Sequence, residues 1–340
     1  MYGVIPLIAS AAFLIAFITT SLMRRWALRM GLLDVPNSRS SHALPTARGG
    51  GIAIVLAFFL AVLVLYSRDL IETRMVEALI SGGGAVALVG LIDDKWPLPA
   101  YVRFSVHAAA AIITILLIGG LPESTLLGWG INSKIIGMSL AVLAFLWGIN
   151  LFNFMDGIDG IAGSEAIFVA SSAAFLNWSV GGNLGVTGAM LCLTAACVGF
   201  LIFNWPPASI FMGDVGSGFL GFTLVLLALY ASQRARISIE VWPILGGVFI
   251  VDASVTLLRR ILRGDRWREA HSLHAYQHLA RRWNAHLPVT LSVSVINLAW
   301  LFPCAWVATR NPTYARYFLV AALVPVIALV ILVGAGRKEN

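Results

Sequence analysis

Residues 3–23, GVIPLIASAAFLIAFITTSLM, contain no charged side chain and are followed directly by Arg24 and Arg25. A helix needs roughly 20 apolar residues to cross a bilayer core of about 30 Å. This stretch therefore has the length and composition of a membrane-spanning helix. Similar apolar stretches recur along the rest of the chain, so the same interpretation extends to the whole fold.

The composition of the whole chain agrees with a membrane protein. Of its 340 residues, 59% are hydrophobic and only 11% are charged, and the mean hydropathy is +0.88. Soluble domains carry about 25% charged residues, so this chain has too little charge to cover a water-facing surface of its size. The composition also excludes a disordered chain, a collagen and a coiled coil.

Eleven apolar segments are candidate membrane helices. The sequence therefore predicts an all-α polytopic membrane protein with about eleven transmembrane helices, forming a single transmembrane domain over residues 1–340. The segments are residues 3–23, 50–66, 75–92, 103–120, 135–151, 163–180, 184–203, 215–231, 241–258, 289–309 and 315–335. Short and glycine-rich segments leave these boundaries loose by a few residues.

The basic residues predict how the chain is oriented. Of the 23 lysines and arginines, 16 lie after the last span or in the odd-numbered loops, counted from the loop after the first span. Because cytoplasmic loops are enriched in lysine and arginine, we expect the N-terminus outside, on the periplasmic side, and the C-terminus in the cytoplasm. The same bias accounts for the net charge of +7, so we expect no nucleic-acid partner.

Acidic and amide side chains cluster in three loops that this topology places on the cytoplasmic face. They are Asp93 and Asp94 in GLIDDKWPLPAYVRF, Asn150, Asn153, Asp156 and Asp159 in NLFNFMDGIDGIAG, and Asn204 and Asp214 in FNWPPASIFMGDVGSG. Each cluster alone would fit an ordinary helix end. However, the loops at 150–164 and 204–214 contain no lysine or arginine, and carboxylates near a low-dielectric boundary are costly without a cation. Oxygen ligands favour Mg²⁺, with Mn²⁺ as the alternative.

Local spacing adds three expectations about these acids. Adjacent Asp93 and Asp94 would repel each other unless a metal ion or a proton lies between them. Asp156 and Asp159 are three residues apart, which would put them on one side of a helical turn. FMGDVGSG lacks the GxxxxGK[ST] spacing, which excludes a P-loop.

Two basic segments offer partners for an anion. In DVPNSRSSHALPTARGGG, residues 34–51, the side chains of Arg39, Thr46 and Arg48 can donate to a phosphate or a nucleotide, although a plain loop before a glycine-rich helix is equally expected. The loop at 259–288 holds seven arginines together with His271, His274 and His278, whose spacing predicts one helical face. Its charge suits either a phosphorylated substrate or anionic lipid headgroups.

One acid lies inside a predicted span. Asp252 falls in the ninth span, in IVDASVTLLRR. An acid within the membrane is a functional candidate by default. Pairing with Arg259 or Arg260 is the structural alternative.

In these motifs and in their order, the chain resembles the polyprenyl-phosphate N-acetylhexosaminyl-1-phosphate transferases (glycosyltransferase family 4). The match runs from about Asp34 to His278 and includes PNSRSSHALPTARGGG, LIDDKWPLPAYVR, NLFNFMDGIDGIAG, FNWPPASIFMGDVGSG and the histidine loop. Within the family, HAYQ at 274–277 is more similar to the enzymes that initiate O-antigen synthesis than to the pentapeptide translocase. The histidine spacing departs from the tight HxHH cluster of many members.

The resemblance implies roles for individual residues. The paired aspartates would engage the polyprenyl phosphate, NxxDGxDG would form the nucleotide-sugar and metal site, and FMGD would supply a metal ligand and a phenylalanine that stacks on uracil. The histidines would lie near the diphosphate. The expected catalytic residues are Asp93, Asp94, Asp156, Asp214, His271 and His274; the expected substrate-binding residues are Arg39, Thr46, Arg48, Arg103, Asn150, Asn153, Asp159, Asn204 and Phe211; and the expected metal ligands are Asp94, Asp156 and Asp214.

The implied reaction transfers N-acetylhexosamine-1-phosphate from a UDP-sugar to undecaprenyl phosphate, giving undecaprenyl-diphospho-sugar and UMP, with Mg²⁺ as cofactor. This would be the first membrane step of O-antigen or another cell-envelope polysaccharide. The resemblance also implies a place among the lipids of the bacterial cytoplasmic (inner) membrane, with the active site on the cytoplasmic face, and it allows a homodimer.

Alternatives remain at this point. Direct displacement by the lipid phosphate is favoured over a covalent aspartyl-phosphate, because the second pKa of a phosphate monoester is about 6 and the nucleophile is already mostly dianionic. From other classes, an ion-coupled secondary transporter would use the carboxylates and histidines as a relay, and an intramembrane aspartyl protease would need a second aspartate in a neighbouring span. Acids gathered on one face argue against the transporter.

Overall fold

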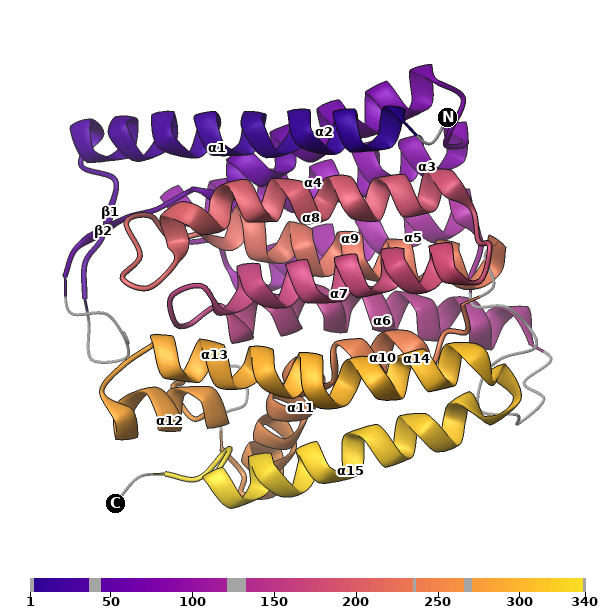
Figure 1. Cartoon of the computed structure of the whole chain (residues 1–340). Helices are drawn as coiled ribbons and strands as arrows, with labels where there is room; N and C mark the ends of the chain where they lie inside the picture. The colour runs from indigo at the N-terminus through magenta and orange to yellow at the C-terminus, as the bar shows by residue number, and fades with distance from the viewer. Residues whose placement is uncertain (1–2, 37–43, 121–132, 235–236, 266–270, 339–340) are drawn as a thin grey trace.

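The computed structural model of the chain describes residues 3–36, 44–120, 133–234, 237–265 and 271–338 and is mostly helical. Most of the long helices run side by side, so that their ends form two opposite faces (Figure 1). Within the described residues, eight helical spans are long and apolar enough to cross a membrane. They are Val4–Met30, Thr73–Lys95, Ala100–Ile118, Lys134–Met155, Leu184–Asn204, Asp214–Arg234, Leu287–Arg310 and Pro312–Val333.

Five of these spans are single helices and three contain short turns of another helix type. The single helices are α1 (Val4–Met30), α5 (Ala100–Ile118), α6 (Lys134–Met155), α8 (Leu184–Asn204) and α9 (Asp214–Arg234). The composite spans consist of α3 (Thr73–Ala78), π-helix η1 (Leu79–Gly83) and α4 (Gly84–Lys95); of α13 (Leu287–Ile296), π-helix η2 (Asn297–Leu301) and α14 (Phe302–Arg310); and of η3 (Pro312–Tyr314) and α15 (Ala315–Val333).

The prediction of an all-α polytopic membrane protein is confirmed, whereas the count of eleven spans stays a prediction. Of the other three predicted segments, two form the helices α2 (Gly51–Ser67) and α7 (Ile161–Ser179). The third is divided at Gly246 into α10 (Val241–Leu245) and α11 (Gly247–Leu262). Helix α1 begins at one end of the bundle and α15 ends at the other (Figure 1); which end faces the cytoplasm stays a prediction.

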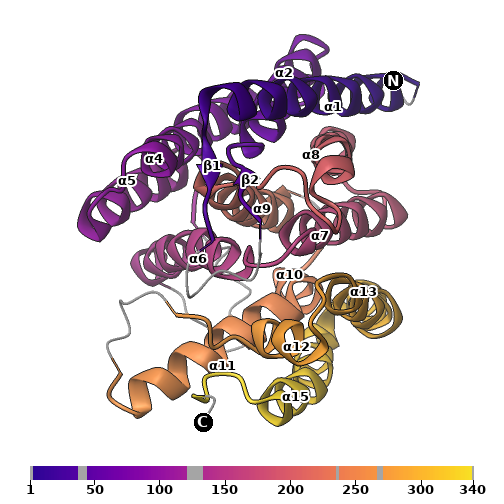
Figure 2. The same cartoon turned by 90° about the vertical axis from the view of Figure 1, so that its left-hand side faces the viewer.

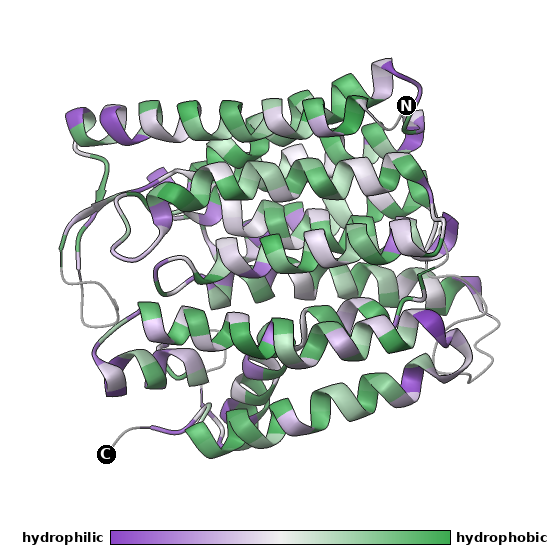
Figure 3. Cartoon of the chain, viewed as in Figure 1, coloured by the Kyte–Doolittle hydropathy of each residue, from purple (hydrophilic) through white to green (hydrophobic). Residues whose placement is uncertain are grey.

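The helices differ in how far they are enclosed by the rest of the protein. Of an 18-residue apolar stretch in α9, 89% is buried inside the protein, whereas only 17% of such a stretch is buried in the span that contains α15. Hydrophobic residues fill the middle of the long helices and hydrophilic residues gather toward their ends (Figure 3). Thus α9 is the central helix, and α15 presents apolar side chains outward, as expected where lipid is the solvent.

Close packing fixes α9 against α6. A Cβ at Gly221 of α9 would clash with the backbone carbonyl of Gly148 in α6. Small residues at such crossings let membrane helices approach closely enough for backbone contact. The position of α9 matters because the helix begins at Asp214, one of the predicted site residues.

Short strands connect two loops at the end of the bundle where α9 begins (Figure 2). Strands β1 (Leu33–Asp34) and β2 (Thr46–Ala47) pair antiparallel, and Ala47 forms a parallel bridge to Ile210. The Phe211 N–H donates to the Ala47 carbonyl (2.8 Å), and the Gly50 N–H donates to the Phe211 carbonyl (2.9 Å). These bonds hold the segment around Arg48 beside the loop that leads into α9.

Helix α12 (Ala275–Trp283) lies at the same end and is capped by Asp252 of α11. The Asp252 carboxylate accepts the N–H groups of Ala275 (2.8 Å) and Tyr276 (3.1 Å), the first residues of α12. Arg259, one of the two expected ion-pair partners of Asp252, instead donates to the Ala335 carbonyl (2.6 Å). Asp252 is therefore a helix cap, because its oxygens satisfy amides that begin a helix and have no partner inside it.

Candidate active site

A cavity of about 200 Å³ is lined by residues from β1, from the segment after β2 and from the N-terminal end of α9. The predicted site residues that line it are Arg48, Asn153, Asp156, Asp159, Asn204, Phe211 and Asp214. The other polar residues in its lining are Asp34, Ser217, Gln277 and His286, which the sequence did not single out as site residues. Three separate loop motifs thus converge on one cavity.

Asp94 holds the N-terminal end of α9. Its Oδ1 accepts the N–H of Asp214 (2.8 Å) and its Oδ2 accepts the N–H of Val215 (3.2 Å). Gly213 has φ +76°, and a Cβ at this position would clash with the Asp94 carboxylate. The glycine of the FMGD motif therefore gives Asp94 room to reach the helix end, where the helix dipole also favours a negative charge.

Two arginines separate the charges of the three aspartates. Arg48 Nη2 lies 2.8 Å from Asp94 Oδ1 and 3.2 Å from Asp214 Oδ1. Arg103 Nη1 lies 2.6 Å from Asp93 Oδ2 and 3.6 Å from Asp214 Oδ2. Asp93 and Asp94 thus have one arginine each. The arginines therefore relieve the repulsion for which the sequence predicted a metal ion or a proton.

The electrostatics of the loops depend on how burial and charge oppose each other. Burial disfavours the Arg48 cation, but the Asp94 and Asp214 carboxylates outweigh that effect and raise the pKa of Arg48. Burial, followed by the charge of Asp214, raises the pKa of Asp156 well above its ordinary value, although Arg48 acts in the opposite direction. Asp156 and Asp214 would therefore be stabilised by a further cation in the cavity.

The residues around the cavity fit a metal ion that is shared with a substrate. Within the described parts of the chain, no group of three or more His, Cys, Asp or Glu side chains forms a complete metal site. Asp156 and Asp214 nevertheless supply carboxylate oxygens, and Asn153 supplies an amide oxygen. Mg²⁺ is usually bound through one or two carboxylates together with water and substrate phosphates, which is the donor set available here.

Asp159 and Asn204 tie two loops of the site together. Asp159 Oδ2 accepts the Ala208 N–H (3.0 Å), and Asn204 Oδ1 accepts the Gly160 N–H (3.1 Å) while its Nδ2 donates to the Ile210 carbonyl (2.9 Å). The expectation of a helical turn carrying Asp156 and Asp159 is wrong, because both lie in the loop between α6 and α7. Their backbone is held by these cross-links and not by helical bonds.

Asn150 and Thr46, two of the predicted binding residues, do not line the cavity. The Asn150 side chain donates to the Leu146 carbonyl (2.7 Å) on its own helix, and the Thr46 hydroxyl donates to the Leu44 carbonyl (3.0 Å). Arg39 lies outside the described residues. None of these contacts assigns a substrate, so the expected binding roles of the three residues stay predictions.

The histidine motif is arranged differently from the expected helical face. Helix α12 begins at Ala275, so His271 and His274 precede it, with ring centroids 4.9 Å apart. Neither histidine is among the residues that line the cavity. Burial, followed by the neighbouring His274 and Arg260, lowers the pKa of His271 to about 4.

Gln277 and His286 reach the cavity from the C-terminal part of the chain. His286 Nδ1 lies 3.2 Å from Asp159 Oδ2, and Gln277 Oε1 accepts the His274 N–H (3.2 Å). Tyr276, the residue before Gln277, donates its hydroxyl to the Phe154 carbonyl (2.9 Å) at the end of α6. Gln277 belongs to the HAYQ sequence, whereas no motif distinguishes His286 from the other histidines of the segment.

Comparisons with known proteins give one consistent result. Residues 76–232 match the family model described as glycosyl transferase family 4. The chain is 30% identical over 329 residues to a probable undecaprenyl-phosphate N-acetylglucosaminyl 1-phosphate transferase of Bacillus subtilis, covering 92% of this chain and 88% of that protein. It is 28% identical to a decaprenyl-phosphate N-acetylglucosaminephosphotransferase of Mycolicibacterium smegmatis (85% and 78% covered). With an undecaprenyl-phosphate alpha-N-acetylglucosaminyl 1-phosphate transferase of Escherichia coli O157:H7 it shares 24% identity (71% and 67% covered).

Proposed function

The chain belongs to glycosyl transferase family 4, and we propose that it transfers N-acetylhexosamine-1-phosphate from a UDP-sugar to undecaprenyl phosphate, with UMP as the leaving group. The names of its relatives support this type of reaction. The observation that carries the proposal is the position of Asp214, which lines the cavity between Arg48 and Arg103. None of the relatives named above is a transporter, so the ion-coupled alternative has no support.

Charge neutralisation is the main requirement of this reaction. An oxygen of the lipid phosphate attacks the sugar-bearing phosphorus, a new P–O bond forms, and the bond to the UMP oxygen breaks. Phosphoryl transfer depends on positioning and on cations that stabilise the developing charge. Arg48 and Arg103 are already oriented by aspartates, so we assign to them the binding of phosphate oxygens. Asp93 needs only to position the acceptor or take a residual proton, because a phosphate monoester is mostly dianionic above a pKa of about 6.

Mg²⁺ is the proposed cofactor, with Mn²⁺ as the alternative. We assign Asp156 and Asp214 as its ligands, because both line the cavity. Asp94, the third acid of the expected ligand set, already accepts two amides and faces Arg48, so its proposed role is to position Asp214. When bound, the metal would neutralise charge on the phosphates.

The acceptor explains why the enzyme is a membrane protein. A lipid chain gains about 0.8 kcal/mol per buried CH₂, so undecaprenyl phosphate stays in the bilayer and the site must reach it at the membrane rim. We propose that this rim is the cytoplasmic side of the bacterial inner membrane, where UDP-sugars are available. The proposed role is the first membrane step of O-antigen or another envelope polysaccharide, and the homodimer stays a prediction.

Release of UMP by the purified full-length protein tests the proposal. The assay contains undecaprenyl phosphate, Mg²⁺ and one of a panel of UDP-N-acetylhexosamines. We expect release that requires both lipid and metal, is lost in Asp214→Asn, and is kept in Asp69→Asn. The control removes one negative charge at an exposed position where asparagine tolerates the observed φ of +55°. Absence of release with every donor, from protein shown to be folded, or full activity of Asp214→Asn would contradict the proposal.

A further inference from the structure

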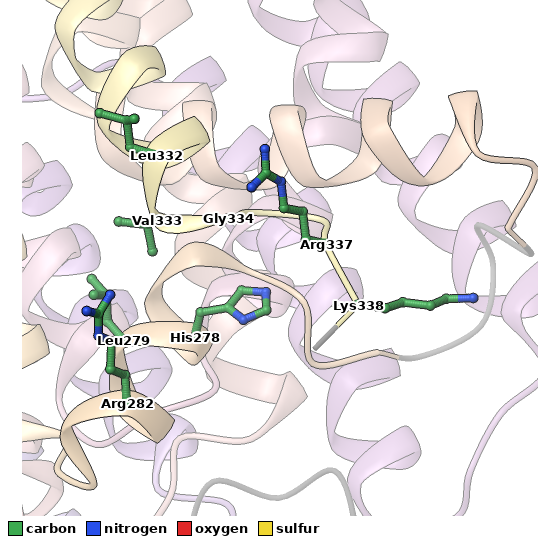
Figure 4. Close-up of a pocket in the computed structure, with 8 residues that line it drawn as sticks. All are labelled: His278, Leu279, Arg282, Leu332, Val333, Gly334, Arg337 and Lys338. Carbon is green, nitrogen blue, oxygen red and sulfur yellow. The ribbon is translucent and has the colours of Figure 1, made fainter. Parts of the chain in front are cut away.

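A second cavity, of about 270 Å³, lies between α12 and the C-terminal end of α15 (Figure 4). It is lined by His278, Leu279, Arg282, Leu332, Val333, Gly334, Arg337 and Lys338. It shares no lining residue with the active-site cavity. Both cavities are lined by residues of α12, since Gln277 lines the first and His278 lines the second.

The second cavity is basic. Arg282, Arg337 and Lys338 bring positive charge to it, and its described lining contains no carboxylate. Lys338 is 3.4 Å from Asp265 and extends away from the other side chains (Figure 4). In the part of the chain that the structure describes, the guanidinium groups of Arg282 and Arg337 make neither a hydrogen bond nor an ion pair. Two guanidinium groups are therefore available to bind an anion.

The C-terminal wall of this cavity is fixed by specific contacts. Arg259 donates to the Ala335 carbonyl (2.6 Å) and Arg263 donates to the Gly336 carbonyl (2.7 Å). The Gly336 N–H in turn donates to the Leu273 carbonyl (2.7 Å), just before α12. These bonds hold the turn after α15 against α11 and α12, so Arg337 keeps a defined place in the cavity.

Apolar surface adjoins these charges. Leu332 in the lining is 81% exposed, and Leu329, one turn earlier on α15, is 43% exposed. Helix α15 is also the least enclosed of the candidate spans. An outward apolar helix face that ends at two arginines is the pattern expected at the boundary between acyl chains and headgroups.

We propose that this cavity binds the phosphate of an anionic phospholipid, such as phosphatidylglycerol, with Arg282 and Arg337 on the headgroup and the acyl chains along the exposed face of α15. The shape of the surface favours a lipid over free phosphate, because a soluble anion would gain nothing from Leu332 and Leu329. A bound headgroup also restrains α12, the helix that carries Gln277 to the active-site cavity.

Lipid retention by the full-length protein in detergent tests this site. Native mass spectrometry would measure phosphatidylglycerol and phosphatidylcholine bound to the wild type, to the double variant Arg282→Ala/Arg337→Ala, and to Arg25→Ala/Arg29→Ala. The last pair is a matched control, since both arginines are exposed near the end of α1 and the charge change is the same. We expect phosphatidylglycerol binding to weaken about fivefold for each arginine of the cavity and to be unchanged in the control.

Folding and ligand identity are checked in the same samples. Without added lipid, the melting temperature of the cavity variant should equal that of the wild type, because neither guanidinium has a partner in the described structure. An equal loss of binding in both double variants, or no loss in either, would overturn the site. If inorganic phosphate raised the melting temperature of the wild type as much as phosphatidylglycerol does, the lipid assignment would be overturned. Displacement of bound phosphatidylglycerol by undecaprenyl phosphate would overturn it as well.

Discussion

The N-terminal ends of α9 and α12 are each capped by an aspartate from another helix. Asp94 of α4 accepts the first amides of α9 at 2.8 and 3.2 Å, and Asp252 of α11 accepts the first amides of α12 at 2.8 and 3.1 Å. The backbone contact is the same in both. It satisfies amides that have no partner within their helix and places a negative charge at the positive end of the helix dipole.

The surroundings of the two caps differ. Asp94 also faces Arg48, and the helix that it holds begins with Asp214 at the cavity. Asp252 instead accepts the Thr256 hydroxyl (3.2 Å) and lies 3.4 Å from His274, with no cavity residue among these neighbours. One cap therefore holds the carboxylate of Asp214 at the candidate active-site cavity, whereas the other anchors a helix. An acid inside an apolar segment is not by itself a sign of chemistry.

The largest expected difference between the caps is in catalysis. In Asp94→Asn, the neutral side chain has only one carbonyl oxygen, so it cannot accept both N–H groups of α9 and no longer forms an ion pair with Arg48. Asp214 and Arg48 therefore both lose their alignment. We expect UMP release to fall about 10³-fold, as for loss of a positioned charge-stabilising group. Asp252→Asn should lose less than about tenfold, because the removal of Asp252 leaves the Asp94–Asp214 contacts intact. If both variants were folded and lost UMP release equally, the two caps would not differ in their contribution to catalysis.

The next largest expected effect is a loss of stability in Asp252→Asn. Its replacement by asparagine leaves a buried N–H at the start of α12 without an acceptor, which costs about 2 kcal/mol. We expect a lower unfolding midpoint in detergent and faster hydrogen exchange at Ala275 and Tyr276. Asp94→Asn serves as the matched control, with faster exchange at Asp214 and Val215 instead. Unchanged exchange at α12 in Asp252→Asn would contradict its role as a cap.

The sequence predicted the first cap region better than the second, for physical reasons. Apolar runs and arginines predicted the topology, and the topology placed the acids of three loops at one end. The structure finds Asp156, Asp159 and Asp214 in the lining of one cavity, whereas Asp93 and Asp94 do not line it and pair with Arg103 and Arg48. The orientation of α12 depends on Asp252, which is 23 residues away from Ala275. The sequence around the histidines does not show this long-range contact, so their spacing alone wrongly suggested one helical face beginning at His271. For the same reason, Gln277 and His286 were not recognised as lining residues.

The smallest effect concerns His271, beside the second cap. Burial, with the nearby His274 and Arg260, lowers its pKa to about 4, whereas an unfolded chain has an ordinary histidine pKa of about 6.5. Between these values the unfolded chain binds a proton that the folded protein does not, so stability falls as the pH drops below about 6.5. Asp252 and Asp265 oppose this shift without cancelling it. At pH 5.5 the loss should be no more than about 1 kcal/mol, and His271→Gln should unfold with a weaker dependence on pH between 7 and 5 than the wild type. Parallel pH profiles for the two proteins would show that His271 is protonated as readily in the folded protein as in the unfolded chain.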